Sequence, residues 1–419
     1  MSSIRVNELL RGRGRAVVFF CMQETGHFQR LRPLIAGLTR WGMVAHVFTH
    51  RKFRKQVESA GGLFFDLFSK YPLELADDES IPISSRFVTF AATYAEQIRR
   101  DVEKLKPSLV IHDTFAVIGR VIATLLDVPR VNVCAGHNVA PARYLAALPH
   151  DPRVRISQLC LDAVKVLRDS YGMMDASPFS YVSAISPHLN IYCEPPEFLD
   201  QEERPPFEPI AFYGSLPFLE EEKANERTGR AYFGSGGARE FKVYISFGTI
   251  VWRYYAEEAL RALSTLAATI ADIDNLRAVI SLGRARVDST TIAALRRSNV
   301  SVKSYVDQWR ILDDADVFFT HNGMNSTHEA IFHLVPMISY PFFWDQPELA
   351  DKCQKFGLAI PLVGSAREKF GEDHVRSALT RLADEGESMR AALTRAREWE
   401  RAVIETRPAV HRRIVDLIE

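Results

Sequence analysis

The sequence has 419 residues, and its 52 Lys and Arg residues balance its 52 Asp and Glu residues. This balance gives no field that would steer the chain onto nucleic acid or an anionic membrane surface, so both partner classes are disfavoured. The length exceeds what one hydrophobic core usually supports, and the hydrophobic content of 47% is ample for burial, so two domains are expected.

The cysteines and the N-terminal residues bear on the cellular compartment. The five cysteines are scattered, mostly within apolar runs, and show no metal-ligand spacing. They are Cys21, Cys134, Cys160, Cys193 and Cys353. Residues 1–15 lack the apolar core of a signal peptide, and no apolar run is long enough to span a bilayer. We therefore expect a soluble, cytoplasmic protein with reduced cysteines.

Strand-like and helix-like segments alternate through the first half of the chain. The expected order is strand 16–21, helix 28–41, strand 44–49, helix 52–60, strand 63–68, a long helix within 84–105, strand 109–112, a further helix, strand 131–134 and a helix at 156–169. Such alternation predicts a parallel sheet with helices on both faces.

A segment rich in Pro, Gly and charge, residues 195–237, is typical of an inter-domain linker, which we place at 216–240. A second alternating series follows it. Its strands are expected at 242–247, 278–282, 300–306, 317–320, 337–340 and 358–361. The sequence therefore predicts an α/β protein of two doubly wound, Rossmann-like domains, 1–215 and 241–385, facing across a cleft.

A dinucleotide-binding protein would show the same two halves, but its glycines would follow the first strand. Here the glycine runs precede the strands, so neither is placed to cradle a pyrophosphate. These glycines are Gly12, Gly14, Gly234, Gly236 and Gly237.

His27 and Asp113 are candidate catalytic residues, because each follows a strand of the first sheet and belongs at its carboxyl edge. An imidazole with a pKa near neutrality suits a general base, and a buried carboxylate on its other nitrogen stabilises the imidazolium. Asp113 has a second interpretation as N-cap of the following helix. His112 alternates to the opposite side of its strand and is expected to pack against helices.

The most informative segment runs from Thr320 to Gln346. An apolar strand at 316–320 leads into it, and a polar turn and a helix follow. Asn325 or Ser326 is expected to cap that helix. The unpaired N–H groups of its first turn favour a diphosphate, and His321, Asn325 and Ser326 can add donors. Glu329 lies one turn beyond Ser326, where its carboxylate could accept hydrogen bonds from two ribose hydroxyls.

The segment resembles the signature of the family-one glycosyltransferases, a group that includes plant glucosyltransferases and bacterial macrolide glycosyltransferases. The matching positions are His321, Gly323, Ser326, Glu329, Ala330, Val335, Pro336, Asp345 and Gln346. Ser246-Phe-Gly-Thr249 resembles another loop of that family, and Gly26-His27 resembles its catalytic motif. This chain departs from the family pattern at Arg30 (Pro), Tyr305 (Trp), Asp307 (Pro) and Leu349 (Asn).

The resemblance implies the GT-B fold and an inverting transfer of a hexose from a UDP-sugar, UDP-glucose first, with no cofactor or metal. It implies His27 as base and Asp113 as its orienting partner. It implies donor contacts as follows: Gly248, Thr249, His321, Gly323, Asn325 and Ser326 at the diphosphate; Tyr305, Val306, Gln308 and Glu329 at uracil and ribose; Asp345 and Gln346 at the sugar. It also implies that the helices of 386–419 return to the first domain, with 389–403 as the candidate. The alternative without a function is that the segment around His321 and Glu329 is an ordinary capped helix packed on a parallel sheet.

Asp314 and Asp316 form an Asp-x-Asp pair of the kind that holds a metal in other glycosyltransferases. They precede a strand, so they belong at the edge opposite the donor site, and we expect no metal there.

The acceptor is expected to be a small hydrophobic natural product, bound by residues of 84–94 and 137–181. The candidates are Phe87, Phe90, Tyr94, His137, Met173, Met174 and Phe179, and ordinary core packing explains them equally well. Rival functions are a UDP-sugar 2-epimerase and a non-catalytic donor-binding activator of another transferase. Either a monomer or a homodimer is compatible with the sequence.

Overall fold

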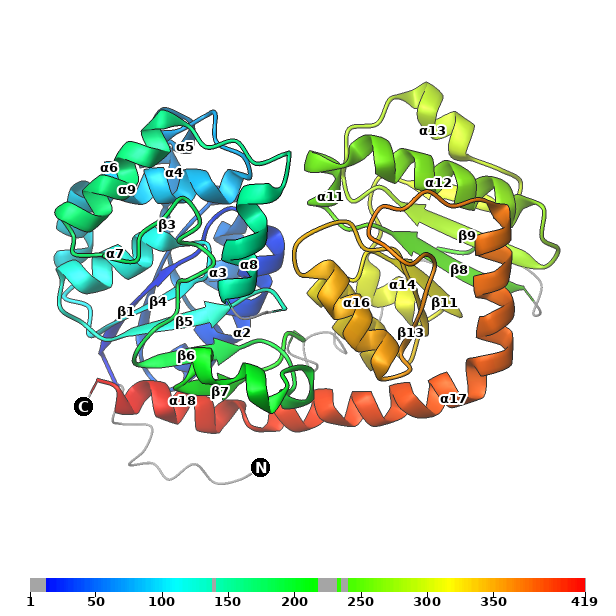
Figure 1. The fold of residues 1–419 in the computed structure, drawn as a ribbon. Coiled ribbons are helices and arrows are strands. Elements are labelled where there is room, and N and C mark those ends of the chain that lie inside the picture. Colours follow the sequence, from blue (N-terminus) through cyan, green and yellow to red (C-terminus); the bar gives the residue numbers. More distant parts are fainter. Residues whose placement is uncertain (1–12, 138–140, 218–231, 235–239, 419) are drawn as a thin grey trace. The chain divides into compact units, whose positions relative to one another are not determined.

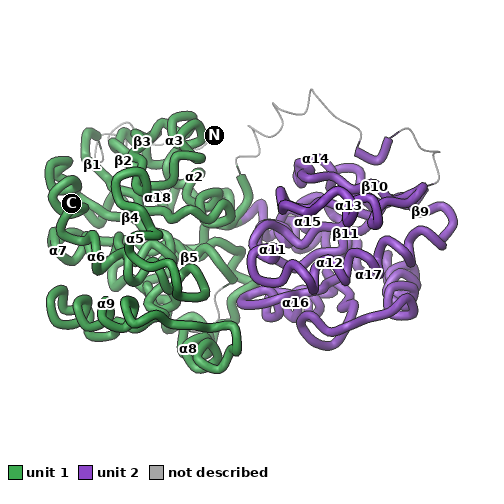
Figure 2. The backbone as a smooth tube through the Cα atoms, turned by 90° about the horizontal axis from the view of Figure 1, so that it is seen from above, with its two compact units in different colours: residues 1–217, 403–419 green, residues 218–402 purple. Residues whose placement is uncertain are grey.

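The computed structural model describes residues 13–137, 141–217, 232–234 and 240–418. The chain divides into two compact units, coloured separately in Figure 2. Unit 1 comprises Met1–Pro217 and Val403–Glu419, and unit 2 comprises Phe218–Ala402.

Unit 1 is built on a parallel sheet whose seven strands lie in the order β3-β2-β1-β4-β5-β6-β7 (Figure 1). The strands are β1 (Ala16–Phe20), β2 (Val44–Thr49), β3 (Leu63–Asp66), β4 (Leu109–Asp113), β5 (Arg130–Cys134), β6 (Leu189–Tyr192) and β7 (Ile210–Phe212). The central strands β1 and β4 are almost wholly buried, as expected for a sheet covered on both faces.

Helices cover both faces of this sheet. They are α2 (Thr25–Arg40), α3 (Arg54–Ser59), α4 (Leu67–Lys70), α5 (Leu73–Ala76), α6 (Ile83–Glu103), α7 (Val117–Leu125), α8 (Pro141–Ala147) and α9 (Gln158–Asp169). Single 3₁₀ turns occur at η1 (Arg51–Phe53), η2 (Leu148–His150), η3 (Pro196–Phe198), η4 (Gln201–Glu203) and η5 (Pro205–Phe207). The side chains of Val18 and Phe20 point to the same face of the sheet and pack in one hydrophobic core with residues of α6, α7 and α9.

Unit 2 repeats the design with a second parallel sheet, in the order β10-β9-β8-β11-β12-β13. Its strands are β8 (Phe241–Ser246), β9 (Leu276–Ser281), β10 (Val300–Lys303), β11 (Val317–Thr320), β12 (Met337–Ser339) and β13 (Ala359–Pro361). Its helices are α11 (Val251–Tyr254), α12 (Ala256–Ala271), α13 (Ser289–Leu295), α14 (Gln308–Leu312), α15 (Met324–Phe332), α16 (Gln346–Lys355) and most of α17 (Glu372–Glu405). The prediction of two doubly wound α/β domains is confirmed.

The segment around 195–212, which looked like part of a linker, belongs instead to unit 1. Its prolines start 3₁₀ turns, and Ile210–Phe212 pairs with β6 as the edge strand β7, where a shortage of donors is tolerated. Most of the predicted linker 216–240, together with Gly12, Gly236 and Gly237, lies outside the described residues.

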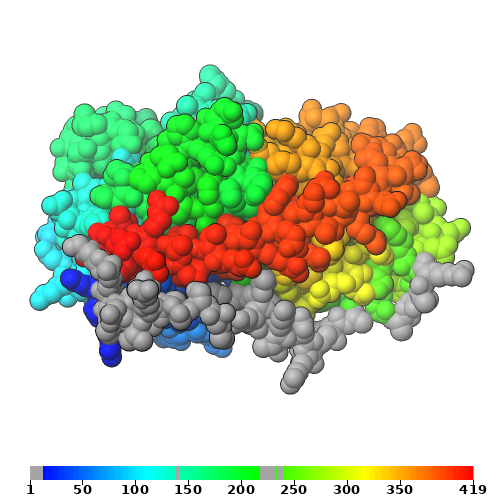
Figure 3. Space-filling model, turned by 90° about the horizontal axis from the view of Figure 1, so that it is seen from below, coloured from blue at the N-terminus to red at the C-terminus, as the bar shows by residue number. Residues whose placement is uncertain are grey.

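The C-terminal return to unit 1 also begins later than expected. Met389 is buried in the core of unit 2, and unit 1 takes up the chain again at Val403. The helix that packs on unit 1 is α18 (Arg407–Asp416). The Nε2 atom of its His411 and the hydroxyl of Tyr213 form a 2.8 Å hydrogen bond. The outer side of this helix is at the surface, red in Figure 3.

All five cysteines are buried and unpaired by disulfides, as the sequence indicated. No helix among the described residues is long and apolar enough to cross a bilayer.

Candidate active site

His27 and Asp113 meet at the carboxyl edge of the unit 1 sheet. The chain leaves β1 and starts α2 at Thr25, so His27 lies in the first helical turn, and Asp113 is the last residue of β4. Because β1 and β4 are parallel neighbours, both positions fall at the same edge. His27 Nδ1 lies 3.0 Å from Asp113 Oδ1, with 15% of the histidine side chain exposed and none of the aspartate.

Asp113 is held as a carboxylate by donors from three directions. Besides His27, the backbone N–H of Met22 donates at 3.0 Å and that of Phe115 at 2.8 Å. Burial alone would raise the pKa of Asp113, but the hydrogen bonds from His27, Met22 and Phe115 lower it below its ordinary value. The interpretation as N-cap of α7 is wrong, since that position is taken by Ala116.

Phe115 is a neighbour of the pair that the sequence reasoning missed. Its ring centroid lies 4.0 Å from that of His27, and Tyr181 packs edge-on against it at 5.5 Å. The only signal in the sequence was an aromatic residue two positions after Asp113. His112 points away as expected, toward Gly119 of α7, where an added Cβ would lie 2.4 Å from His112 Cβ.

Arg30 occupies the position where the family motif has proline, and it is buried within α2. Its Nη1 donates to the carbonyl of Gly26 at 2.6 Å, one turn back along the helix. The arginine therefore ties down the entry of α2 beside His27, and Pro33 is accommodated inside the same helix.

In unit 2, β11 leads through a turn into α15, as the sequence predicted. The N-cap is Gly323 and not Asn325 or Ser326, which lie inside the first turn of the helix. The expected cap is therefore wrong, although both side chains remain at the end where the backbone N–H groups are unpaired.

His321 is enclosed by two glycines of this turn and of the loop after β8. A Cβ on Gly248 would lie 2.6 Å from His321 Nε2, and one on Gly323 would lie 2.4 Å from it. Gly248 also has a left-handed φ of 69°, so close approach and backbone shape both require glycine there. Burial lowers the pKa of His321 to about 4, so the imidazole is neutral at pH 7.

Glu329 and Ser326 are joined through Gln308, the first residue of α14. Gln308 donates from Nε2 to Glu329 Oε2 at 2.7 Å, and its Oε1 accepts from Ser326 Oγ at 3.3 Å. Thr249, which follows Gly248 in the chain, is exposed, whereas Val306 is buried. Tyr305 keeps 51% of its surface exposed.

Asp345 and Gln346 begin α16, as N-cap and first helical residue, with Pro347 directly after them. The Oε1 atom of Gln346 accepts from the backbone N–H groups of Phe342 and Phe343, at 2.9 and 3.3 Å. This pair therefore starts a helix, and its sugar-binding role stays a prediction.

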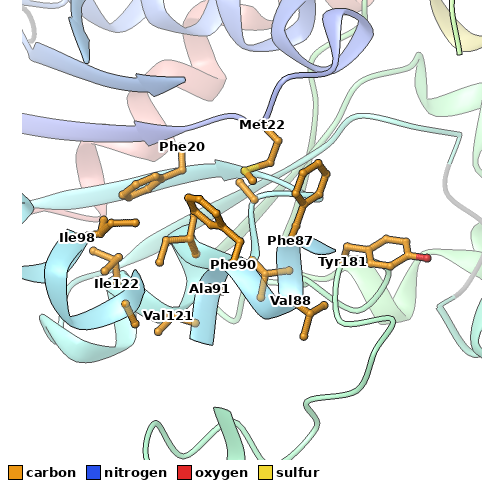
Figure 4. Packing of buried hydrophobic residues seen from close by; sticks show 14 of the residues in the cluster. Phe20, Met22, Phe87, Val88, Phe90, Ala91, Ile98, Val121, Ile122 and Tyr181 are labelled. Carbon is orange, nitrogen blue, oxygen red and sulfur yellow. The ribbon is translucent and has the colours of Figure 1, made fainter. Parts of the chain in front are cut away.

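The acceptor candidates are largely core residues. Phe87, Phe90, Met173 and Phe179 are buried in one hydrophobic cluster, and Tyr94 packs against it (Figure 4 labels Phe87 and Phe90). Met174 is exposed. His137 is also buried, and its Nδ1 lies 2.7 Å from Glu194 Oε2. Contact with an acceptor stays a prediction for all of them.

The Asp-x-Asp pair lies at the opposite edge of the unit 2 sheet, as argued from the sequence. Asp314 forms an ion pair with Lys242, and Asp316 Oδ2 accepts from the Lys242 backbone N–H at 2.7 Å. Among the described residues, no cluster of His, Cys, Asp and Glu side chains is arranged to hold a metal ion.

Comparison with known proteins points to a class of enzyme. The family model described as UDP-glucoronosyl and UDP-glucosyl transferase matches residues 203–387. A similar curated protein is YdhE of Bacillus subtilis, an uncharacterized UDP-glucosyltransferase, 24% identical over 347 residues that cover 81% of this chain and 83% of YdhE.

Solved structures show the fold. The glycotransferase of kitacinnamycin aligns with a TM-score of 0.73 at 22% identity, covering 96% of this chain and 99% of that one. The spinosyn rhamnosyltransferase SpnG, complexed with thymidine diphosphate, aligns with a TM-score of 0.64 at 17% identity, covering 94% and 99%.

The two parallel-sheet units and the donor motif therefore define a glycosyltransferase of the GT-B class that uses nucleotide-sugar donors. Within that class, the family model over residues 203–387 and the similarity to YdhE support a family-one glycosyltransferase.

Proposed function

We propose that the enzyme inverts the anomeric centre of a UDP-hexose, UDP-glucose first, as it transfers the sugar to a hydroxyl of a small hydrophobic acceptor. The observation that carries this proposal is the His27–Asp113 pair, in which Nδ1 of the imidazole is bound to a fully buried carboxylate. That contact leaves Nε2 as the nitrogen that takes a proton.

In this reaction the acceptor O–H bond breaks and its proton passes to His27 Nε2. The acceptor oxygen bonds to the anomeric carbon, and the carbon–oxygen bond to the diphosphate breaks with its electron pair leaving on UDP. One displacement from the face opposite the leaving group inverts the configuration. Asp113 stabilises the imidazolium as it forms.

The donor assignment rests on unit 2. The first turn of α15 presents backbone N–H groups, with Asn325 and Ser326 beside them, to a diphosphate. Glu329, oriented by Gln308, would accept from the ribose hydroxyls, and Asp345 with Gln346 would bind the hexose. For the acceptor, the half-buried Phe115 ring against His27 supports an apolar molecule.

The test is transfer from UDP-glucose to a panel of aromatic and polyketide alcohols, detected by mass spectrometry, with the product anomer assigned by NMR. We expect a β-linked product from the α-linked donor. His27→Ala should lower turnover about a hundredfold to ten-thousandfold without changing the Kd of UDP. His150→Ala, which alters an exposed histidine of the same unit, is the control. An α-linked product, or wild-type turnover by His27→Ala, would contradict the proposal.

A further inference from the structure

Arg284 stands out in unit 2 because of its backbone. It follows β9 in a tight turn in which Gly283 has a φ of 58° and Arg284 a φ of 68°, closed by a 2.9 Å hydrogen bond from Ala285 N–H to the Leu282 carbonyl. Two successive left-handed residues are normally Gly, Asn or Asp. An arginine held there is strained, and such strain gathers at functional sites.

The turn is fixed against the proposed donor loops on both sides. A Cβ on Gly283 would lie 2.1 Å from the Gly248 carbonyl oxygen, so the turn packs directly on the loop that precedes Thr249. On the other side, the Arg284 N–H donates to the Ser304 carbonyl at 2.7 Å, next to Tyr305. The backbone has little freedom to carry the arginine elsewhere.

The side chain of Arg284 lies on Tyr305. Its guanidinium carbon is 4.2 Å from the centroid of the tyrosine ring, a cation–π contact. Tyr305 is the single large hydrophobic residue of unit 2 that stands exposed among the described residues. Arg284 forms no ion pair with any described carboxylate, and its guanidinium lies against the Tyr305 ring.

We propose that Arg284 is a positioning residue for the nucleobase: it covers one face of Tyr305 and holds the ring so that the other face receives the pyrimidine of the donor. This inference rests on the proposed role of Tyr305 as the base platform. A half-exposed tyrosine would otherwise have to be ordered when the nucleotide binds, which lowers affinity. The Arg284 guanidinium, already in contact with the ring, removes that cost before the nucleotide binds.

Three substitutions test the inference by calorimetric titration with UDP and with uridine. Arg284→Asn keeps a residue that tolerates the left-handed turn but removes the cation. We expect the Kd of both ligands to rise by the same factor, about two- to fivefold, the size of an exposed cation–π contact. Arg284→Lys should restore most of the affinity, and Arg286→Asn, which removes a neighbouring exposed charge, should change nothing.

The Tyr305→Ala background separates the possible outcomes. Loss of a stacking platform should weaken UDP by about tenfold, and Arg284→Asn should then have no further effect. A persisting effect in that background, or weaker UDP with unchanged uridine, would show that Arg284 contacts the nucleotide itself and would overturn the positioning role. Unchanged UDP binding by Arg284→Asn alone would also overturn it. If Tyr305→Ala left UDP binding unchanged, the proposed base platform would fail instead.

Discussion

Gln308 Nε2 donates to Glu329 Oε2 across 2.7 Å, and this bond sets the orientation of the carboxylate on α15. Gln308 begins α14 and Glu329 lies in the middle of α15, so two helices that follow different strands are coupled at one side chain. The proposed ribose contact therefore depends on a residue that need not touch the ribose.

Gln308→Ala should raise the KM for the donor, because Glu329 loses a hydrogen bond that fixes its direction. A hydrogen bond to a charged group contributes about 1.5–3 kcal/mol, so we expect about a tenfold to hundredfold increase. Gln308→Glu should be worse, because it places a second carboxylate against the first. The KM for the acceptor serves as the internal reference, and Gln354→Ala, at an exposed glutamine of α16, is the control. Equal rises in both KM values would argue against a donor-specific role.

Much of this arrangement follows from the sequence, because the end of a strand in a parallel sheet fixes where the next residues lie. His27, Asp113, His321 and Gly248 could be placed that way. Arg284 could not, since nothing in the sequence indicates that an arginine adopts a left-handed turn against Tyr305.

The acceptor residues could not be assigned from the sequence for a different reason. Apolar residues at helical spacing look alike whether they line a binding site or fill a core, and burial shows that Phe87 and Phe90 fill the core. Phe115 lies beside His27 only because β4 and β1 are neighbours, a relationship that local sequence does not contain.

Stability should depend on pH through His411, which joins α18 to Tyr213. Burial, followed by the charges of Arg407 and Arg40, lowers the pKa of His411 to about 3. Between about pH 6.5 and pH 3, His411 is protonated in the unfolded chain but neutral in the folded one. The free energy of unfolding therefore falls as the pH falls through this range.

His411→Gln should remove this contribution, which amounts to about 2 kcal/mol at pH 5. The measurement is urea unfolding at pH 5 and pH 7 for the wild type and the variant, with His374→Gln at an exposed histidine as the control. The variant should lose less stability on acidification than the wild type. Identical losses would mean that His411 is not held in its neutral form.

Chelation should leave transfer unchanged. At the edge of the sheet opposite α15, the Lys242 side chain already forms an ion pair with Asp314, and the Lys242 backbone N–H donates to Asp316. Backbone N–H groups of α15 are available to the phosphates. The measurement is the initial rate before and after EDTA, followed by addition of Mg²⁺ or Mn²⁺. A rate that collapses with EDTA and returns with either metal would show that a cation takes part.

The enzyme should prefer UDP-glucose to dTDP-glucose, two donors that carry the same sugar and differ at the ribose 2′ position and the base methyl group. Glu329 gains a hydrogen bond from the 2′-hydroxyl that deoxyribose cannot give, and a hydrogen bond to a charged group contributes about 1.5–3 kcal/mol. We expect about a tenfold to hundredfold preference in kcat/KM, measured by competition between the two donors. Glu329→Ala should reduce that preference toward unity, whereas Asp345→Asn, which alters the proposed sugar contact, should slow both donors alike. A preference that persists in Glu329→Ala would remove this carboxylate from ribose recognition while leaving the catalytic pair in unit 1 unaffected.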